Sequence, residues 1–319
     1  MAKEATVKIR DVLSVMVATA LAVAGAGCMP PDRSAATKNL EREIAAMPGV
    51  ESATARYSND FENGAELRLD VAMSQAGDDQ ITAVVARIND LKNDDFKRHR
   101  QYETFLVGRG LAIEREAELN AGQIVADARV LRRIRTDVPH GRIEWSRYGN
   151  HSRLEIRSVT QTMEPLVSAL EALGNDVGTT VYVRSDNPAA APTWEVEVPT
   201  SMRRKDFEGL LAGLPLAAYY VHLDHESVVG LDVYVAEKDS AFRDLSAVIH
   251  AVGPTEEDPL ELRWAQVKET DNQHRFVGSL RVPGCSPAQG SAAEERSVHG
   301  LSPEAVLLQR QLGKQAASC

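Results

Sequence analysis

Three hairpins with the same alternation of apolar and polar residues constrain the fold of this chain more than any other feature. In the first, Glu66-Leu67-Arg68-Leu69-Asp70-Val71 places every second residue on one side. The segments 153–157 and 230–235 follow the same rule. Successive side chains of a strand point to opposite faces, so each hairpin has one buried face and one solvated face. The core residues that we expect from this pattern are Leu67, Leu69, Val71, Leu154, Ile156, Leu231, Val233 and Val235.

The same order of elements recurs around each hairpin. In the first unit a short helix precedes strands near 51–57 and 65–73, and an amphipathic helix and a strand at 102–107 follow. The third unit gains a strand at its start, in which Trp194, Val196 and Val198 alternate with Glu195 and Glu197. This α-β-β-α-β order predicts an α+β fold of three tandem small α/β open sandwiches, ferredoxin-like and with antiparallel sheets.

The recurrence also predicts how the chain is divided. We expect the first unit at 38–110, the second at 111–190 and the third at 191–284, with a Pro- and Ala-rich linker at 185–192. The tail 285–319 carries one short helix from Pro303 to about Leu312, with Ser302 as its N-cap. The element order resembles that of the small BON modules of bacterial envelope proteins, which are associated with phospholipid surfaces, and serves as a label for the architecture alone.

The N-terminal segment predicts export from the cytoplasm. Basic residues precede an apolar run that begins at Val12 and closes on small residues at 24–27, which is the layout of a secretory signal. The residues Ala26-Gly27-Cys28 resemble the end of a bacterial lipoprotein signal, although the family usually has Leu where this chain has Gly25. The resemblance implies a signal peptide at 1–27, a diacylglycerol group on Cys28 and a tether at 28–37.

Two alternatives to lipidation remain open. A signal-peptidase cut after Ala26 would release a secreted protein in which Cys28 is an unmodified thiol. An uncleaved membrane anchor is the third reading, but the apolar run is shorter than the ~20 residues that span a bilayer. The other two cysteines, Cys285 and Cys319, form an even pair that can oxidise outside the cytoplasm, with two free thiols as the alternative.

One hairpin carries side chains that could ligate a metal. His222, Asp224 and Glu226 alternate along it, and imidazole and carboxylate together suit zinc or a similar ion. The same alternation sends His225 to the other side, unless a turn overrides it. We therefore name His222, Asp224 and Glu226 as candidate metal ligands, with a solvated hairpin tip as the alternative.

The sequence has few other residues that indicate a catalytic or cofactor-binding site. His140 and His151 are expected on the surface, and the chain has no phosphate-binding loop and no glycine-rich dinucleotide turn. Trp145, Trp194 and Trp264 fall on predicted strands and are expected to be core or sheet-face residues, with ligand stacking as the alternative. We expect no cofactor, and these residues give no evident catalytic activity.

The charge distribution limits the partners. The net charge of −10 and the interspersed basic residues argue against nucleic acid as a partner. The resemblance of the N-terminal segment to a lipoprotein signal implies anchoring on the extracytoplasmic side of the cell membrane. Together with the repeated modules and the lack of catalytic residues, it predicts a binding or scaffold protein with an unknown envelope protein or lipid as partner. The alternatives are an extracytoplasmic metal-assisted hydrolase that uses the His222 cluster and a carrier of a hydrophobic ligand.

Overall fold

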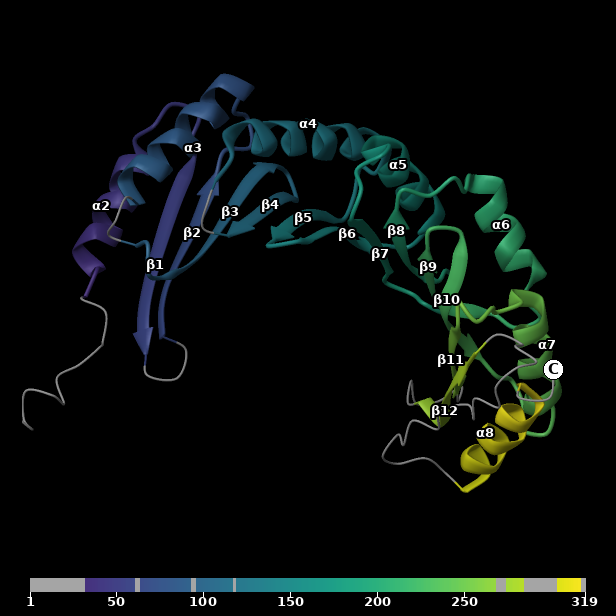
Figure 1. Cartoon of the computed structure of the whole chain (residues 1–319). Coiled ribbons are helices and arrows are strands. Elements are labelled where there is room, and N and C mark those ends of the chain that lie inside the picture. Colours follow the sequence, from purple (N-terminus) through teal and green to yellow (C-terminus); the bar gives the residue numbers. More distant parts are fainter. Residues whose placement is uncertain are drawn as a thin grey trace, which may run out of the picture.

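In the computed structural model, helices alternate with antiparallel strand pairs that join into one sheet (Figure 1). The structure describes residues 32–60, 64–92, 96–116, 119–267, 274–283 and 303–316. The sheet has twelve strands in sequence order. Hairpin partners such as β1 and β2 are antiparallel, whereas the strands on either side of a helix, such as β2 and β3, are parallel. The repeating unit is therefore a helix followed by a hairpin.

The strands are short and evenly distributed along the chain. Their bounds are β1 (Ser52–Asp60), β2 (Gly64–Ala72), β3 (Arg100–Gly108), β4 (Leu111–Glu116), β5 (Arg142–Tyr148), β6 (His151–Val159), β7 (Thr179–Ser185), β8 (Thr193–Val198), β9 (Ala218–Asp224), β10 (Ser227–Tyr234), β11 (Leu260–Val267) and β12 (His274–Val282).

The helices cover one face of the sheet. Their bounds are α2 (Ser34–Ala45), α3 (Asp78–Lys92), α4 (Ala121–Asp137), α5 (Met163–Leu173), α6 (Arg204–Gly213), α7 (Ala241–Val252) and α8 (Pro303–Ala316). The sheet curves into an arch whose convex side carries the helices, and no described helix lies on its inner side (Figure 1). None of the helices in the described ranges is long and apolar enough to cross a membrane.

A continuous apolar layer between the helices and the sheet forms the core. All of the hairpin residues expected there are buried, which confirms the alternation argument. Trp145, Trp194 and Trp264 are also buried, as expected. The helices contribute the stripe at i, i+3, i+4 and i+7, shown by Ile81, Val84, Val85 and Ile88 of α3. The sheet and the helices thus share one core from β1 to β12.

The prediction of three ferredoxin-like sandwiches is wrong. The twelve strands form one mixed sheet, and it continues across residues 110 and 190 without a break. The second unit was expected to begin at residue 111, but this segment is β4, which pairs with β3 on one side and with β5 on the other. Residues 185–192 were expected to be a linker and instead connect the antiparallel neighbours β7 and β8.

The physical reason for the error lies in β4. Alternation identified most other strands, but here Leu111, Ala112 and Ile113 are all buried in succession, and Arg115 occupies a buried position two residues later. A strand of this composition has no period-2 signal. Without it, the strand at 102–107 appeared to end a unit, whereas β3 and β4 form the next hairpin of the sheet.

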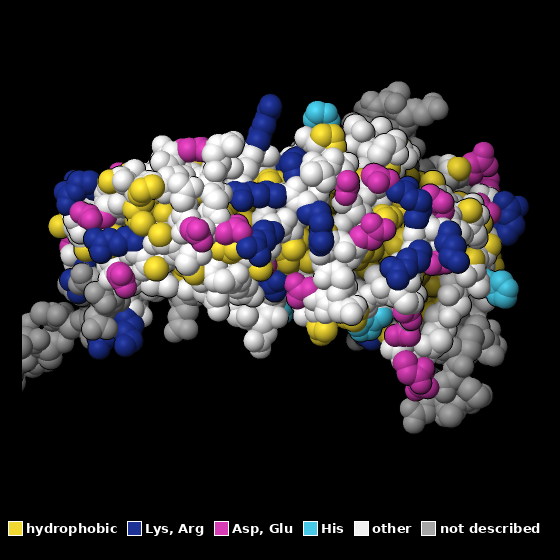
Figure 2. Space-filling view, turned by 90° about the horizontal axis from the view of Figure 1, so that it is seen from above, with side chains coloured by type: hydrophobic (Ala, Val, Ile, Leu, Met, Phe, Trp, Pro, Cys, Tyr) yellow, Lys and Arg dark blue, Asp and Glu magenta, His cyan; other side chains and the backbone are white. Residues whose placement is uncertain are grey.

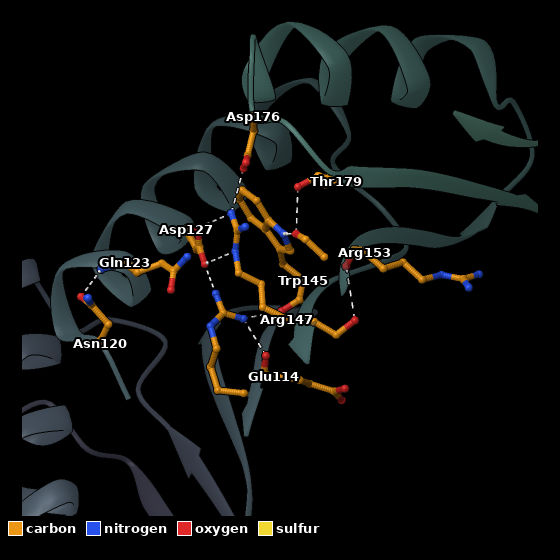
Figure 3. Close-up of polar contacts among 12 residues, drawn as sticks. Glu114, Asn120, Gln123, Asp127, Trp145, Arg147, Arg153, Asp176 and Thr179 are labelled. Atoms are coloured by element: carbon orange, nitrogen blue, oxygen red, sulfur yellow. Dashed lines mark hydrogen bonds and ion pairs between the residues drawn. The ribbon is translucent and has the colours of Figure 1, made fainter. Parts of the chain in front are cut away.

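A buried ion network fixes α4 to the centre of the sheet (Figure 3). The carboxylate of Asp127 on α4 forms an ion pair with Arg115 of β4 and lies 3.4 Å from Arg147 of β5. Arg147 also reaches Asp176 at 2.8 Å, and its guanidinium lies 4.4 Å from the ring centre of Trp145. Arg115 donates to the carbonyl oxygen of Trp145 at 3.0 Å. Sequence patterns did not indicate this network, because its charges occupy positions that normally hold apolar residues.

Asp127→Asn should destabilise the protein strongly. It leaves the guanidinium of Arg115 buried without a carboxylate, and breaking a buried pair in this way costs about 3–5 kcal/mol. Chemical denaturation followed by circular dichroism measures the change. Asp176→Asn is the matched control, because Asp176 is more exposed and its loss should cost about 1 kcal/mol or less. Equal losses in the two variants would contradict the central role of Asp127.

Candidate functional site

The concave face of the sheet is the surface that no described helix covers. We define it as the sheet face opposite the helices, and its side chains alternate with those of the core. The convex face looks different in Figure 2, where side chains of both charges are scattered among apolar ones over the helices. Such mixed charge is typical of an ordinary solvated surface. The concave face is therefore the candidate site.

Strand register aligns concave side chains into rows that cross the sheet. One row runs through Glu144, Glu155, Tyr182, Glu195, His222, Gly230, Glu261 and Arg281, from β5 to β12. A second row runs through Thr193, Tyr220, Asp232, Arg263 and Ser279. Side chains opposite each other on neighbouring strands lie close enough to interact. The rows bring together residues from hairpins far apart in the sequence.

Arginines compensate the like charges within these rows. Glu144 and Glu155 are direct cross-strand partners, as are Arg142 and Arg157. Arg142 lies 2.7 Å from Glu144, and Arg157 lies 2.6 Å from Glu155. Burial raises the pKa of Glu144, and a hydrogen bond with Glu114 raises it further. The hydroxyl of Tyr148 donates to Glu114 at 2.5 Å.

Two open pockets lie side by side on this face. The first, the arginine pocket, has a volume of about 820 Å³ and is lined by Arg153, Arg157, Arg184, Arg263, Tyr182, Tyr219 and Tyr220, with Asp186, Glu195 and Asp232 among its other residues. The second, the acidic pocket, has a volume of about 770 Å³ and its carboxylates are Glu197, Asp224, Asp232, Glu257, Asp258 and Glu261. The two pockets share Tyr220, Asp232 and Arg263.

Hydrogen bonds hold the shared wall between the pockets. Tyr220 donates its hydroxyl to Glu195 at 2.6 Å, and burial, followed by this hydrogen bond, raises the pKa of Tyr220. Burial raises the pKa of Asp232 to about 6, an effect that Arg263 opposes and Glu261 increases. Beside this wall, in the arginine pocket, the ring of Tyr219 lies 4.5 Å from the ring of Tyr234 between centroids. This wall therefore presents aromatic rings beside ionisable groups.

The residues predicted as metal ligands lie at the edge of the acidic pocket. His222 and Asp224 line it, but β9 ends at Asp224 and Glu226 lies in the turn, where it accepts a hydrogen bond from the backbone of Ser201 at 3.2 Å. His225, with a φ of 53°, contacts the carbonyl oxygen of Pro199 at 2.7 Å. Within the described ranges no three metal-capable side chains converge. The metal site stays a prediction without support from this geometry.

The other predicted residues divide into two groups. His140 and His151 are exposed, as expected. Cys28, Cys285 and Cys319 lie outside the described residues. The arginine pocket was not predicted, although the alternation Arg153-Leu154-Glu155-Ile156-Arg157 had marked one side of that strand as solvated. Its arginines come from three strands, β6, β7 and β11, whose proximity depends on the sheet.

Comparisons with known proteins leave the site to be interpreted from its own chemistry. No protein-family model, curated protein or solved structure matches this chain.

The raised pKa of Asp232 predicts a pH-dependent stability. A carboxyl whose pKa is higher in the folded state stabilises the fold below its unfolded value of 3.8, and this contribution disappears as pH rises through 6. Asp232→Asn removes the buried charge and keeps the shape. We expect it to raise the free energy of unfolding by about 1–2 kcal/mol at pH 7.5 and to make no difference near pH 3.5.

Urea denaturation at the two pH values measures this effect. Glu208→Gln on the solvent side of α6 is the control and should change stability by less than about 0.5 kcal/mol at both. A destabilised Asp232→Asn protein at pH 7.5 would show that the contact of Asp232 with Arg263 outweighs the cost of burial.

Proposed function

We propose that this protein is an extracytoplasmic lipoprotein of the cell envelope, anchored through Cys28, and that it binds its partner on the concave face. The observation that carries the proposal is the asymmetry of the sheet, which has helices on one face and, within the described residues, none on the other. A sheet built from hairpins commonly has one face packed on the core and one face exposed to solvent. The exposed face of this sheet carries two open pockets. Concave surfaces of this kind are where most proteins bind their ligands.

The chemistry of the face supports binding over the alternatives. A carrier of a hydrophobic ligand needs an enclosed apolar cavity, whereas both pockets are open and lined by ionisable side chains. A metal-assisted hydrolase needs converging ligands, and the described part of the chain offers no such group. Binding requires only an accessible surface with fixed polar groups, which the rows of the concave face supply.

The N-terminal connection would place the arch close to the membrane. Helix α2 begins at Ser34, so only residues 29–33 separate Cys28 from the folded part, which makes six residue steps to Ser34. Six extended residues reach at most about 20 Å. Strand β7, in the arginine pocket, is the sixth strand beyond β1, which at ~4.8 Å per strand is about 29 Å along the sheet. An anchored chain would therefore have its pockets away from the anchored end.

Replacement of the anchoring cysteine tests the first half of the proposal. Cys28→Ala should move the protein from the membrane fraction to the soluble extracytoplasmic fraction, because the thiol that would carry the diacylglycerol is lost. Cell fractionation and immunoblotting measure the shift, with Cys285→Ala as the matched control that stays in the membrane. Mass spectrometry of the N-terminal peptide should show a diacylglycerol mass on Cys28. A Cys28→Ala protein that remains in the membrane fraction would overturn the anchoring claim.

Site-specific photocrosslinking tests the second half. A photoreactive residue at Thr104 or His222 on the concave face should crosslink to the partner in intact cells, since these positions lie on β3 and β9. Matched positions on the convex helices are Arg42 of α2 and Arg243 of α7, both highly exposed. Crosslinked products found from the concave positions alone are the expected result. Products from the convex positions alone would show that the helices bind the partner.

A further inference from the structure

The arginine pocket places four guanidinium groups around one open cavity on an otherwise acidic protein. Arg153 and Arg157 come from β6, Arg184 from β7 and Arg263 from β11. The carboxylates that line the pocket are Asp186, Glu195 and Asp232, and Glu155 and Glu261 lie beside its arginines without lining it, whereas the whole chain has a net charge of −10. Grouping positive charge in a concavity concentrates the local potential and attracts anions.

Most donors of these arginines remain available. Each guanidinium has five N–H groups. Arg157 uses one nitrogen for Glu155 at 2.6 Å, whereas Arg153 is 3.9 Å from the same carboxylate. Arg263 is 4.0 Å from Asp232 and 3.9 Å from Glu261. The side chains of Arg153, Arg157 and Arg263 are 45%, 45% and 56% exposed. Their unused N–H groups are therefore within reach of a ligand.

Arg184 is the arginine of this pocket whose side chain has the fewest polar contacts within the described residues. Its side chain is exposed, and no ion pair joins it to another residue of the described ranges. The nearby Arg153 is oriented instead by Tyr182, whose ring centre lies 4.2 Å from its guanidinium. Cation–π contact fixes a guanidinium without neutralising it. The pocket thus combines oriented cations with one unpaired cation.

We propose that the arginine pocket binds an acidic polysaccharide, a glycan chain that carries carboxylate or phosphate groups. This proposal rests on the proposed function, because it names the ligand class of the same concave face. Arginine forms paired, charge-assisted hydrogen bonds with carboxylate and phosphate. The aromatic rings of Tyr182, Tyr219 and Tyr220 also line the pocket. Arg153 covers one face of Tyr182 and Tyr219 stacks on Tyr234, so the ring of Tyr220 offers the apolar surface on which the C–H face of a sugar ring packs. The combination of cations and tyrosines matches a charged sugar.

The position and the shape of the pocket favour a free chain over a membrane surface. The arginines lie on the inner side of the arch, where a flat bilayer cannot approach them (Figure 1). The acidic pocket lies next to it along the same strands, toward residues 177–178, 197–198 and 257–261, and its carboxylates repel anionic groups at that end of the strands. A polymer chain that enters the pocket from β6 and follows the uncovered face avoids both restrictions.

Binding measurements on the purified full chain test the proposal. We expect fluorescein-labelled polygalacturonate to bind, as followed by fluorescence anisotropy, with an affinity that falls as NaCl rises from 50 to 300 mM. Arg153→Gln combined with Arg184→Gln should raise the Kd at least about tenfold, since two charge-assisted contacts are lost. Arg42→Gln combined with Arg243→Gln on the convex helices is the matched control and should leave the Kd unchanged. Circular dichroism and melting temperatures verify that both proteins are folded.

Competing ligands give the outcomes that would overturn the proposal. Equal affinity for neutral dextran would show that the charge of the arginines does not contribute to binding. Equal affinity for a single-stranded oligothymidylate of similar length would show attraction to any polyanion. Phosphatidylglycerol vesicles that bind as well, with the same loss in the pocket variant, would identify a lipid surface as the ligand. A lack of polygalacturonate binding, with photocrosslinks still confined to the concave face, would refute the ligand class and leave the proposed function intact.

Discussion

The hydrogen bonding of strand edges is the constraint on which this structure depends. A helix and its hairpin bury one apolar face, but they leave two strand edges whose N–H and C=O groups need partners. The parallel junctions supply them, as between β2 and β3 or β4 and β5, so each unit completes its neighbour. At the outer edge a side chain contributes, because Glu41 of α2 accepts the backbone N–H of Ala55 in β1 at 2.8 Å.

The same repetition explains why one face is polar and uncovered. The described helices lie on the same side of the sheet, so most apolar positions of the hairpins point toward them and the alternate, mostly polar positions point inward on the arch. Side chains of like charge then meet across strands, as Glu144 and Glu155 do, and the register also places Arg142 beside Arg157 to neutralise them. The concave face is therefore an ordered array of charges whose neighbours are fixed by backbone pairing.

Two kinds of buried charge have different roles in this arrangement. Asp127 and Arg115 lie between the helix layer and the sheet, where their pairing fixes α4 and no ligand can reach them. Asp232 lies on the concave side, between the two pockets, where its ionisation changes the charge that a ligand meets. The arginine pocket is formed where residues from four hairpins approach each other, and this site combines the accessibility and the charge that binding requires.

The sequence by itself determined the local structure. Alternation identified the core residues of the hairpins, the helical stripe of α3 and the buried positions of the three tryptophans, because these patterns depend on neighbours a few residues away. The N-terminal signal and Cys28 are likewise a prediction from sequence alone. Only the tertiary structure decided that the units form one sheet, because strand edges carry no side-chain code for their partner and β4 lacks alternation. The arginine pocket followed from that pairing, which brings Arg184 and Arg263 together across 79 positions of the chain.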